Sequence, residues 1–109
     1  MSIKHVNKYY DQICSQYQEM LDNLKDLSAE AEQGFIEPER VTRLEQQIAP
    51  IKENYERWAY MMFLLRQPNR EAKIPRYKQQ NKKLLANLSK ANTVEAVIQE
   101  NNKILSDMR

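Results

Sequence analysis

Apolar residues recur in alternating steps of three and four on both sides of the only glycine in the chain, Gly34. This spacing places them on one face of a helix, whereas the side chains of a strand alternate from residue to residue. The two stripes comprise Ile3, Val6, Tyr10, Ile13, Tyr17, Met20, Leu24, Leu27 and Ala31, and then Val41, Leu44, Ile48, Ile51, Tyr55, Trp58, Met62 and Leu65. The pattern predicts two long amphipathic helices, over residues 2–33 and 38–66.

The link between these helices is short enough to force the chain back on itself. Gly34 supplies the left-handed position that commonly ends a helix, and Pro38 suits the first turn of the next one. We therefore expect an antiparallel hairpin. Residue numbers summing to 75 pair Leu24 with Ile51, and a register with sums of 68 fits the apolar stripes equally well. Pro50 falls inside the second helix and off its stripe, where we expect a bend and no stop.

The rest of the chain predicts two shorter helices, over residues 75–90 and 93–108. Pro68 interrupts the second long helix, and Asn92 and Glu95 have the spacing of a capping box at the start of the last one. The long hairpin has more apolar surface at its open end than one facing helix can cover. We expect the two short helices to cover that end, or a second copy of the chain, or both.

The composition agrees with a purely helical chain. It contains one glycine, four prolines and no Asn-Gly or Asp-Gly pair, whereas strand-rich folds use such residues at their turns. We predict one all-α domain over residues 1–109. Its fold class is a helical bundle, built on a long antiparallel, coiled-coil-like hairpin with two shorter C-terminal helices.

The aromatic and large apolar side chains of the hairpin gather toward its open end. Their helical spacing favours a core or an interface over a set that stacks on a ligand. The predicted packing and interaction anchors are Tyr10, Tyr17, Tyr55, Trp58, Met62, Phe63 and Leu65. The longest apolar run extends over eight residues, 58–65, while a membrane-spanning helix needs about twenty. No membrane partner is therefore expected.

Charge is distributed unevenly although the net charge is only +2. Residues 11–56 carry four cations and eleven carboxylates, and residues 57–90 carry nine cations and one carboxylate. Nucleic-acid phosphates could compensate the basic segment 66–83, with Tyr77 stacking on bases. The alternatives are neutralisation by the acidic hairpin, within the chain or between subunits, or by solvent, and binding to an acidic protein or lipid surface. The candidate nucleic-acid-binding residues are Arg66, Arg70, Lys73, Arg76, Tyr77, Lys78, Lys82 and Lys83.

Residues suited to catalysis or metal binding are scarce. His5 and Cys14 are the only histidine and the only cysteine, so they cannot supply the four ligands of a zinc site or a disulfide. One glycine cannot form a phosphate-binding loop. We therefore predict no enzymatic activity, catalytic residue, metal, cofactor or small-molecule substrate. Because the start of the chain lacks a signal-peptide pattern and no disulfide is possible, we expect a cytoplasmic location.

Asn101 lies between Ile98 and Leu105 on the apolar side of the last predicted helix. A polar residue in a buried seam can fix the register of a bundle. A helix edge open to water is the plainer interpretation, and it is the one that we favour.

These features predict a non-enzymatic helical module for protein–protein interaction or assembly. Self-association into a homodimer or a larger oligomer is expected because the apolar flanks of the hairpin need cover, and another protein could serve as well. The alternative is a nucleic-acid-binding accessory factor that uses residues 66–83. Small proteins of phages and other mobile elements often consist of similar amphipathic helices. This is a likeness of architecture, and architecture does not determine function.

Overall fold

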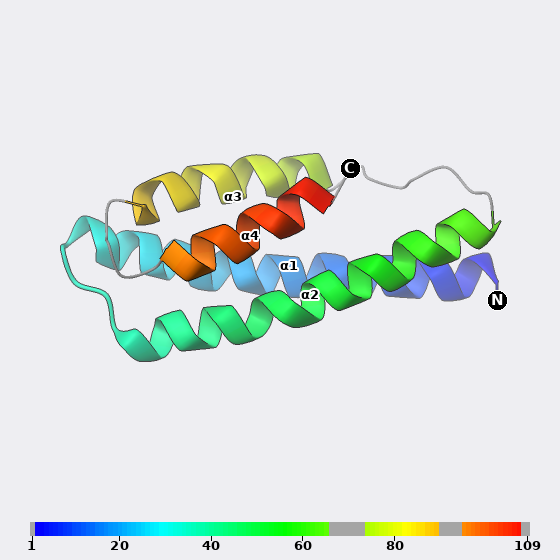
Figure 1. The fold of residues 1–109 in the computed structure, drawn as a ribbon, viewed down its shortest axis with the longest axis horizontal. Helices are drawn as coiled ribbons and strands as arrows, with labels where there is room; N and C mark the ends of the chain where they lie inside the picture. The colour runs from blue at the N-terminus through cyan, green and yellow to red at the C-terminus, as the bar shows by residue number, and fades with distance from the viewer. Residues whose placement is uncertain (1, 66–73, 90–94, 108–109) are drawn as a thin grey trace.

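The computed structural model describes residues 2–65, 74–89 and 95–107. These residues form four helices: α1 (Ile3–Glu32), α2 (Pro38–Leu65), α3 (Ile74–Leu88) and α4 (Glu95–Asp107). They make an elongated all-α bundle with principal extents of 48 × 22 × 18 Å, and the described residues include no strand. The predicted fold class is confirmed, with the long hairpin formed by α1 and α2 (Figure 1).

The ends of α1 and the turn that follows it are specified locally. The Ser2 side chain accepts a hydrogen bond from the backbone N–H of His5, at 3.3 Å, and caps the start of α1. At the other end Gly34 has a φ of 79°, and the Phe35 N–H donates to the Glu30 carbonyl at 3.0 Å. These are the features of a Schellman motif, so the predicted left-handed role of Gly34 is confirmed. The chain then enters α2, which continues through Pro50. The bend expected there stays a prediction.

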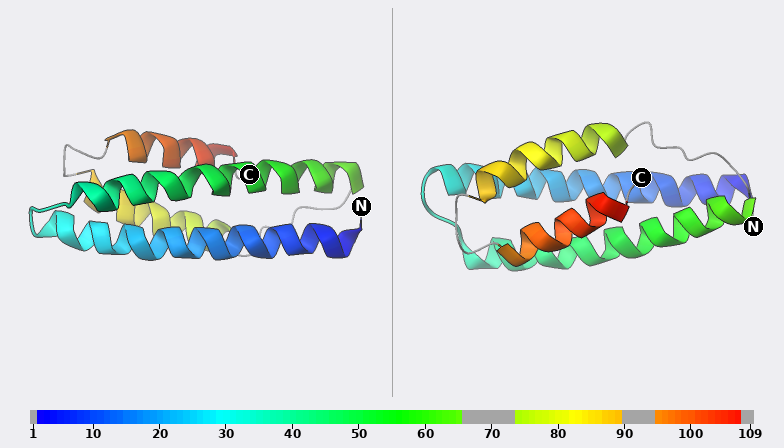
Figure 2. Two further views of the ribbon diagram at one scale, coloured as in Figure 1. Left: turned by 90° about the horizontal axis from the view of Figure 1, so that it is seen from below. Right: turned by 45° about the horizontal axis from the view of Figure 1, so that its top comes forward.

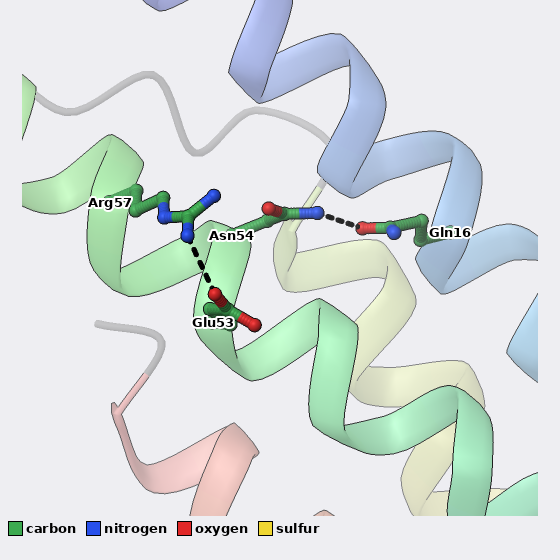
Figure 3. A network of polar contacts seen from close by, with 4 residues as sticks. All are labelled: Gln16, Glu53, Asn54 and Arg57. Atoms are coloured by element: carbon green, nitrogen blue, oxygen red, sulfur yellow. Dashed lines mark hydrogen bonds and ion pairs between the residues drawn. The ribbon is translucent and has the colours of Figure 1, made fainter.

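A ladder of polar side chains joins α1 to α2 along one flank of the hairpin. Its rungs are one ion pair and two amide–amide hydrogen bonds, each 2.8 Å long: Arg40–Glu30, Asn23–Gln47 and Asn54–Gln16. The last of these rungs appears in Figure 3. The rungs are seven residues apart on each helix, and the two residue numbers of every rung sum to 70.

The packing of aromatic rings places the core of the hairpin in the same register. The ring centroids of Tyr10 and Trp58 lie 5.4 Å apart, and their residue numbers sum to 68. The residue numbers paired across the polar ladder sum to 70, which is only two more than the sum for this aromatic pair. The structure therefore adopts the register with sums near 68, and the register with sums of 75 is not formed.

Helices α3 and α4 cover the half of the hairpin next to the α1–α2 turn. Figures 1 and 2 show α3 alongside α1 and α4 running back over α2. Neither short helix reaches the open end of the hairpin, where α1 begins and α2 ends. Tyr77 of α3 stacks on Tyr17 of α1 with centroids 5.6 Å apart, and Asn87 donates to Glu32 at 3.3 Å near the turn. The expectation that the short helices cover the open end is wrong.

The reason lies in a second row of buried side chains on α1. Cys14, Leu21 and Ser28 follow one another at intervals of seven and are at most 5% exposed, so they widen the buried face of α1 in its second half. One heptad earlier the same position is Asn7, a polar residue. Only the turn half of α1 therefore offers a second face on which another helix can pack.

Two asparagines meet in the interior of this four-helix half. Asn81 of α3 and Asn101 of α4 are both 0% exposed, and the Asn81 Nδ2 donates to the Asn101 Oδ1 at 2.8 Å. The Asn101 Nδ2 lies 3.6 Å from the Met20 Sδ of α1. The favoured interpretation of Asn101 as a helix edge open to water is wrong, because the helix face that carries it packs inward. Asn101 is the buried polar residue of the alternative interpretation.

Tyr17 is buried with its hydroxyl group unpaired among the described residues. Desolvation raises the pKa of this hydroxyl well above its ordinary value of 10.0. We expect Tyr17→Phe to raise the free energy of unfolding by about 1 kcal/mol, since the variant removes a buried polar atom without a partner. Urea denaturation at neutral pH measures this difference. A loss of stability would show that the hydroxyl has a partner.

The same variant has a pH dependence whose sign follows from the raised pKa. Above about pH 10 an unfolded tyrosine releases its proton, whereas folded Tyr17 retains it. The folded state of the natural chain therefore loses stability as the pH rises through that range. The stability advantage of Tyr17→Phe over the natural chain should grow as the pH rises from about 9 to about 11. An advantage that stays constant would contradict the burial of the ionisable group.

Candidate interaction surfaces

The last two turns of α2 are apolar on every side. Trp58 and Met62 are 1% and 2% exposed and point into the hairpin. On the outward side Tyr60, Phe63 and Leu64 are 62%, 76% and 45% exposed. These three residues, spaced like anchors on one helix face, form what we call the α2 patch. A helix that is apolar all round is normally buried on all sides, so the exposed face of α2 is unusual for a single chain.

The α2 patch lies at the open end of the hairpin. Figures 1 and 2 show the end of α2 beside the start of α1, beyond the part of the hairpin that α3 and α4 cover. Ile3, at the start of α1, is also 47% exposed. Within the described ranges, this end of the molecule consists of two helices, while the turn end consists of four.

A buried aromatic cluster supports the inner side of the same turns. The Trp58 ring packs between Tyr10 and Tyr55, with centroid separations of 5.4 and 5.6 Å. All three side chains are at most 7% exposed. This buried cluster therefore holds α2 against α1 on the inner side of the turns whose outer side chains form the α2 patch.

The predicted anchors separate into a buried group and an exposed one. Tyr10, Tyr17, Tyr55, Trp58 and Met62 are buried in the core, and Leu65 is half-buried. Phe63 does not anchor the packing of the chain itself, because it lies off the heptad stripe on the outer side of α2. Its role as an interaction anchor stays a prediction.

Two residues of the α2 patch, Tyr60 and Leu64, were not among the predicted anchors. A signal for them exists in the sequence. They lie inside the uninterrupted apolar run 58–65, at positions that a heptad stripe leaves to polar residues.

The basic segment is only partly within the described chain. Arg66, Arg70 and Lys73 lie outside it. Four further cations belong to α3: Arg76, Lys82 and Lys83 are exposed and Lys78 is half-buried.

Tyr77 does not have the base-stacking position proposed for it from the sequence. It is only 7% exposed, and one side of its ring stacks on Tyr17. The guanidinium carbon of Arg76 lies 5.8 Å from its ring centroid. Tyr77 belongs to the inward row of α3, with Ile74 three residues before it and Asn81 four residues after it, so it packs on α1.

The carboxylates of the hairpin do not pair with the cations of α3. Among the described residues the ion pairs are Arg40–Glu30, Arg40–Glu37, Arg57–Glu53 and Lys103–Glu100. Figure 3 shows Arg57 with Glu53, at 2.7 Å, one turn before the α2 patch. Each of these carboxylates pairs with a cation of its own helix or of the hairpin, and none with α3. Arg76, Lys82 and Lys83 of α3 are thus exposed without a carboxylate partner among the described residues.

The two side chains most suited to nucleophilic chemistry are separated on α1. His5 is exposed and meets the Tyr9 ring edge-on, with centroids 5.4 Å apart, while Cys14 is buried. Nine residues of helix place them about 13 Å apart along the axis, beyond hydrogen-bond reach. In residues 2–65, 74–89 and 95–107, no three metal-ligating side chains come together.

Two cavities of the described chain are respectively polar and open to solvent. A cavity of about 90 Å³ is lined by Asn23, Asp26, Arg40 and Arg43, which is smaller than the few hundred Å³ of a typical ligand pocket. A larger hollow of about 640 Å³ lies open to solvent along residues 2–11 at the start of α1.

None of the helices described has the combination of length and apolar character needed to cross a bilayer. Comparisons of the chain with protein-family models, with curated proteins and with solved structures gave no match. The function proposed below is therefore argued from the surfaces of this chain alone.

Proposed function

We propose that the chain is a non-enzymatic helical assembly module that associates with a second copy of itself through the α2 patch. The observation that carries this proposal is the apolar outer face of the last two turns of α2, where Phe63 is 76% exposed. Large exposed aromatic side chains are the residues that most often dominate binding energy at protein interfaces. In keeping with the single cysteine, we place this function in the cytoplasm.

A second copy suits the shape of the patch. Tyr60, Phe63 and Leu64 lie at positions i, i+3 and i+4, so they form one short stripe along the helix axis. Two such stripes can pack antiparallel about a two-fold axis, so that both copies use the same surface at the interface. The neighbouring Arg57 is neutralised by Glu53 at 2.7 Å, which reduces repulsion between two copies.

The size of the patch predicts a weak association. Two aromatic residues and one leucine at these exposures offer on the order of 300 Å² of side-chain surface, against about 800 Å² per partner in a standard stable interface. The dimer should therefore be weak and dissociate on dilution.

Light scattering over a protein concentration series tests this function. We expect the average mass to rise above 13.0 kDa as the concentration increases. Phe63→Ser should raise the dissociation constant about 30-fold, corresponding to the loss of one anchor of about 2 kcal/mol.

Phe35 provides a matched control. It is 63% exposed and lies in the turn at the opposite end of the hairpin, so Phe35→Ser removes a similar phenyl group without affecting the α2 patch. It should associate like the natural chain. A mass of 13.0 kDa at every concentration, or equal losses in both variants, would refute self-association through α2.

A further inference from the structure

The outer face of α3 is a second surface, independent of the α2 patch, and its character is electrostatic. Between Ile74 and Leu88 the helix carries Arg76, Lys78, Lys82 and Lys83 and no carboxylate. Arg76 and Lys78 lie in the first turn and a half, where the positive end of the helix dipole makes cations unfavourable. A helix with this arrangement is stabilised by an external anion.

The rest of the described chain does not supply that anion. None of the ion pairs of the described residues includes a cation of α3. The side-chain hydrogen bond between α3 and a hairpin carboxylate comes from a neutral amide, Asn87, which donates to Glu32 at 3.3 Å. The alternative raised by the sequence, neutralisation by the acidic hairpin, thus finds no support in these contacts.

The exposed residues of α3 favour a nucleic acid over an acidic protein. Apart from its cations, the exposed positions of α3 are Pro75, Gln79, Gln80 and Ala86. This face therefore offers no aromatic or large aliphatic anchor of the kind that protein interfaces use, and it is rich in lysine, which such interfaces avoid. Phosphate backbones require cations and no apolar anchor.

The spacing of the cations suits a duplex. Residues 76–83 extend over about 10 Å of helix axis, and a DNA duplex carries about six phosphate charges over the same length. Because Tyr77 is only 7% exposed and stacks on Tyr17, α3 lacks the aromatic platform that binds unstacked single-stranded bases. We propose that the outer face of α3 binds the phosphate backbone of duplex nucleic acid without sequence preference.

Fluorescence anisotropy with a labelled duplex of mixed sequence tests this proposal. With four phosphate contacts at about −0.9 each, affinity should fall about 100-fold between 50 and 200 mM salt. Lys82→Gln combined with Lys83→Gln should remove two contacts, which reduces that fall to about 10-fold. Changing the duplex sequence should leave the affinity unaltered.

A control variant with the same loss of charge distinguishes binding through α3 from a general attraction between the duplex and any cation of the chain. Lys4 and Lys8 are exposed on α1, at the other end of the molecule, so Lys4→Gln combined with Lys8→Gln should leave the salt dependence unchanged. Circular dichroism confirms that both double variants keep their helical content, so that a change in binding does not reflect unfolding.

Several outcomes would overturn the proposal. One is the absence of binding at 50 mM salt with about 100 µM protein, a concentration at which even non-specific duplex binding is detectable. Another is an equal change of slope in the two double variants. A third is displacement of the duplex by an oligoglutamate of equal charge at equal concentration, because this result would identify an acidic protein as the partner. A mass of 13.0 kDa in the absence of duplex would affect only the proposal of self-association.

Discussion

Trp58→Ala is expected to lower the free energy of unfolding by about 3 to 5 kcal/mol. The side chain is 1% exposed and packs against Tyr10 and Tyr55, so its removal leaves a large cavity in the hairpin core. At the open end no helix among the described residues lies over this core besides α1 and α2, which limits how far it can close around the cavity. Urea denaturation followed by circular dichroism measures the loss, since Trp58 is the only tryptophan.

Two further variants identify the origin of this loss. Trp58→Phe keeps an aromatic ring and removes an indole N–H without a hydrogen-bond partner in the described part of the chain, so it should cost less than about 1.5 kcal/mol. Phe63→Ala removes an aromatic ring from the surface and should cost less than about 0.5 kcal/mol in dilute solution. A loss below about 1 kcal/mol for Trp58→Ala would contradict its place in the core.

Asn101→Ala has the second largest expected effect, a loss of about 2 to 3 kcal/mol. The substitution leaves a small cavity and removes the oxygen to which Asn81 donates at 2.8 Å. Because Asn81 is 0% exposed, its amide cannot exchange this bond for one with water. The loss should appear in urea denaturation as a lower midpoint with an unchanged slope.

Replacing both asparagines tests this explanation. Asn81→Leu combined with Asn101→Leu removes every polar atom of the pair, including the Asn81 Oδ1, which has no partner in the described chain. The double variant should return to within about 1 kcal/mol of the natural stability, since apolar groups of similar volume replace both partners. If it is as unstable as Asn101→Ala, a stranded amide is not the cause. Asn102→Ala, at an exposed position of α4, serves as the control.

The positions of the long helices follow from local signals in the sequence. Steps of three and four define the buried face of each helix, and the cap at Ser2 and the left-handed turn at Gly34 involve only neighbouring residues. Such signals act within a few residues of the chain, so they can be recognised without knowing what the helix packs against.

The register of the hairpin does not follow from the apolar stripes. A shift by one heptad again places apolar side chains opposite each other, so the stripes alone give two equivalent answers. The flanking residues distinguish them. In the observed register Gln16 meets Asn54 at 2.8 Å, whereas the shifted register would place Gln16 opposite Met61. The information was present in polar residues, which pattern analysis treats as solvent-facing.

The candidate sites were predictable to a similar, partial degree. The cations of α3 were identified from the sequence, but the burial of Tyr77 depends on which face α1 offers to α3. That face exists only where Cys14, Leu21 and Ser28 add a second buried row. Since a single helix pattern does not reveal its neighbours, the exposed or buried state of such flanking residues requires the packed structure.

The separation of the two surfaces along a bundle 48 Å long has a consequence for valency. The α2 patch lies at the open end, and α3 lies on the half next to the turn. Two chains joined at their open ends would carry one cationic helix toward each extremity of the pair. A single long duplex could then engage both, and the second contact would form at the high effective concentration set by the first. Dimerisation would thereby strengthen a weak attachment without any additional contact residue.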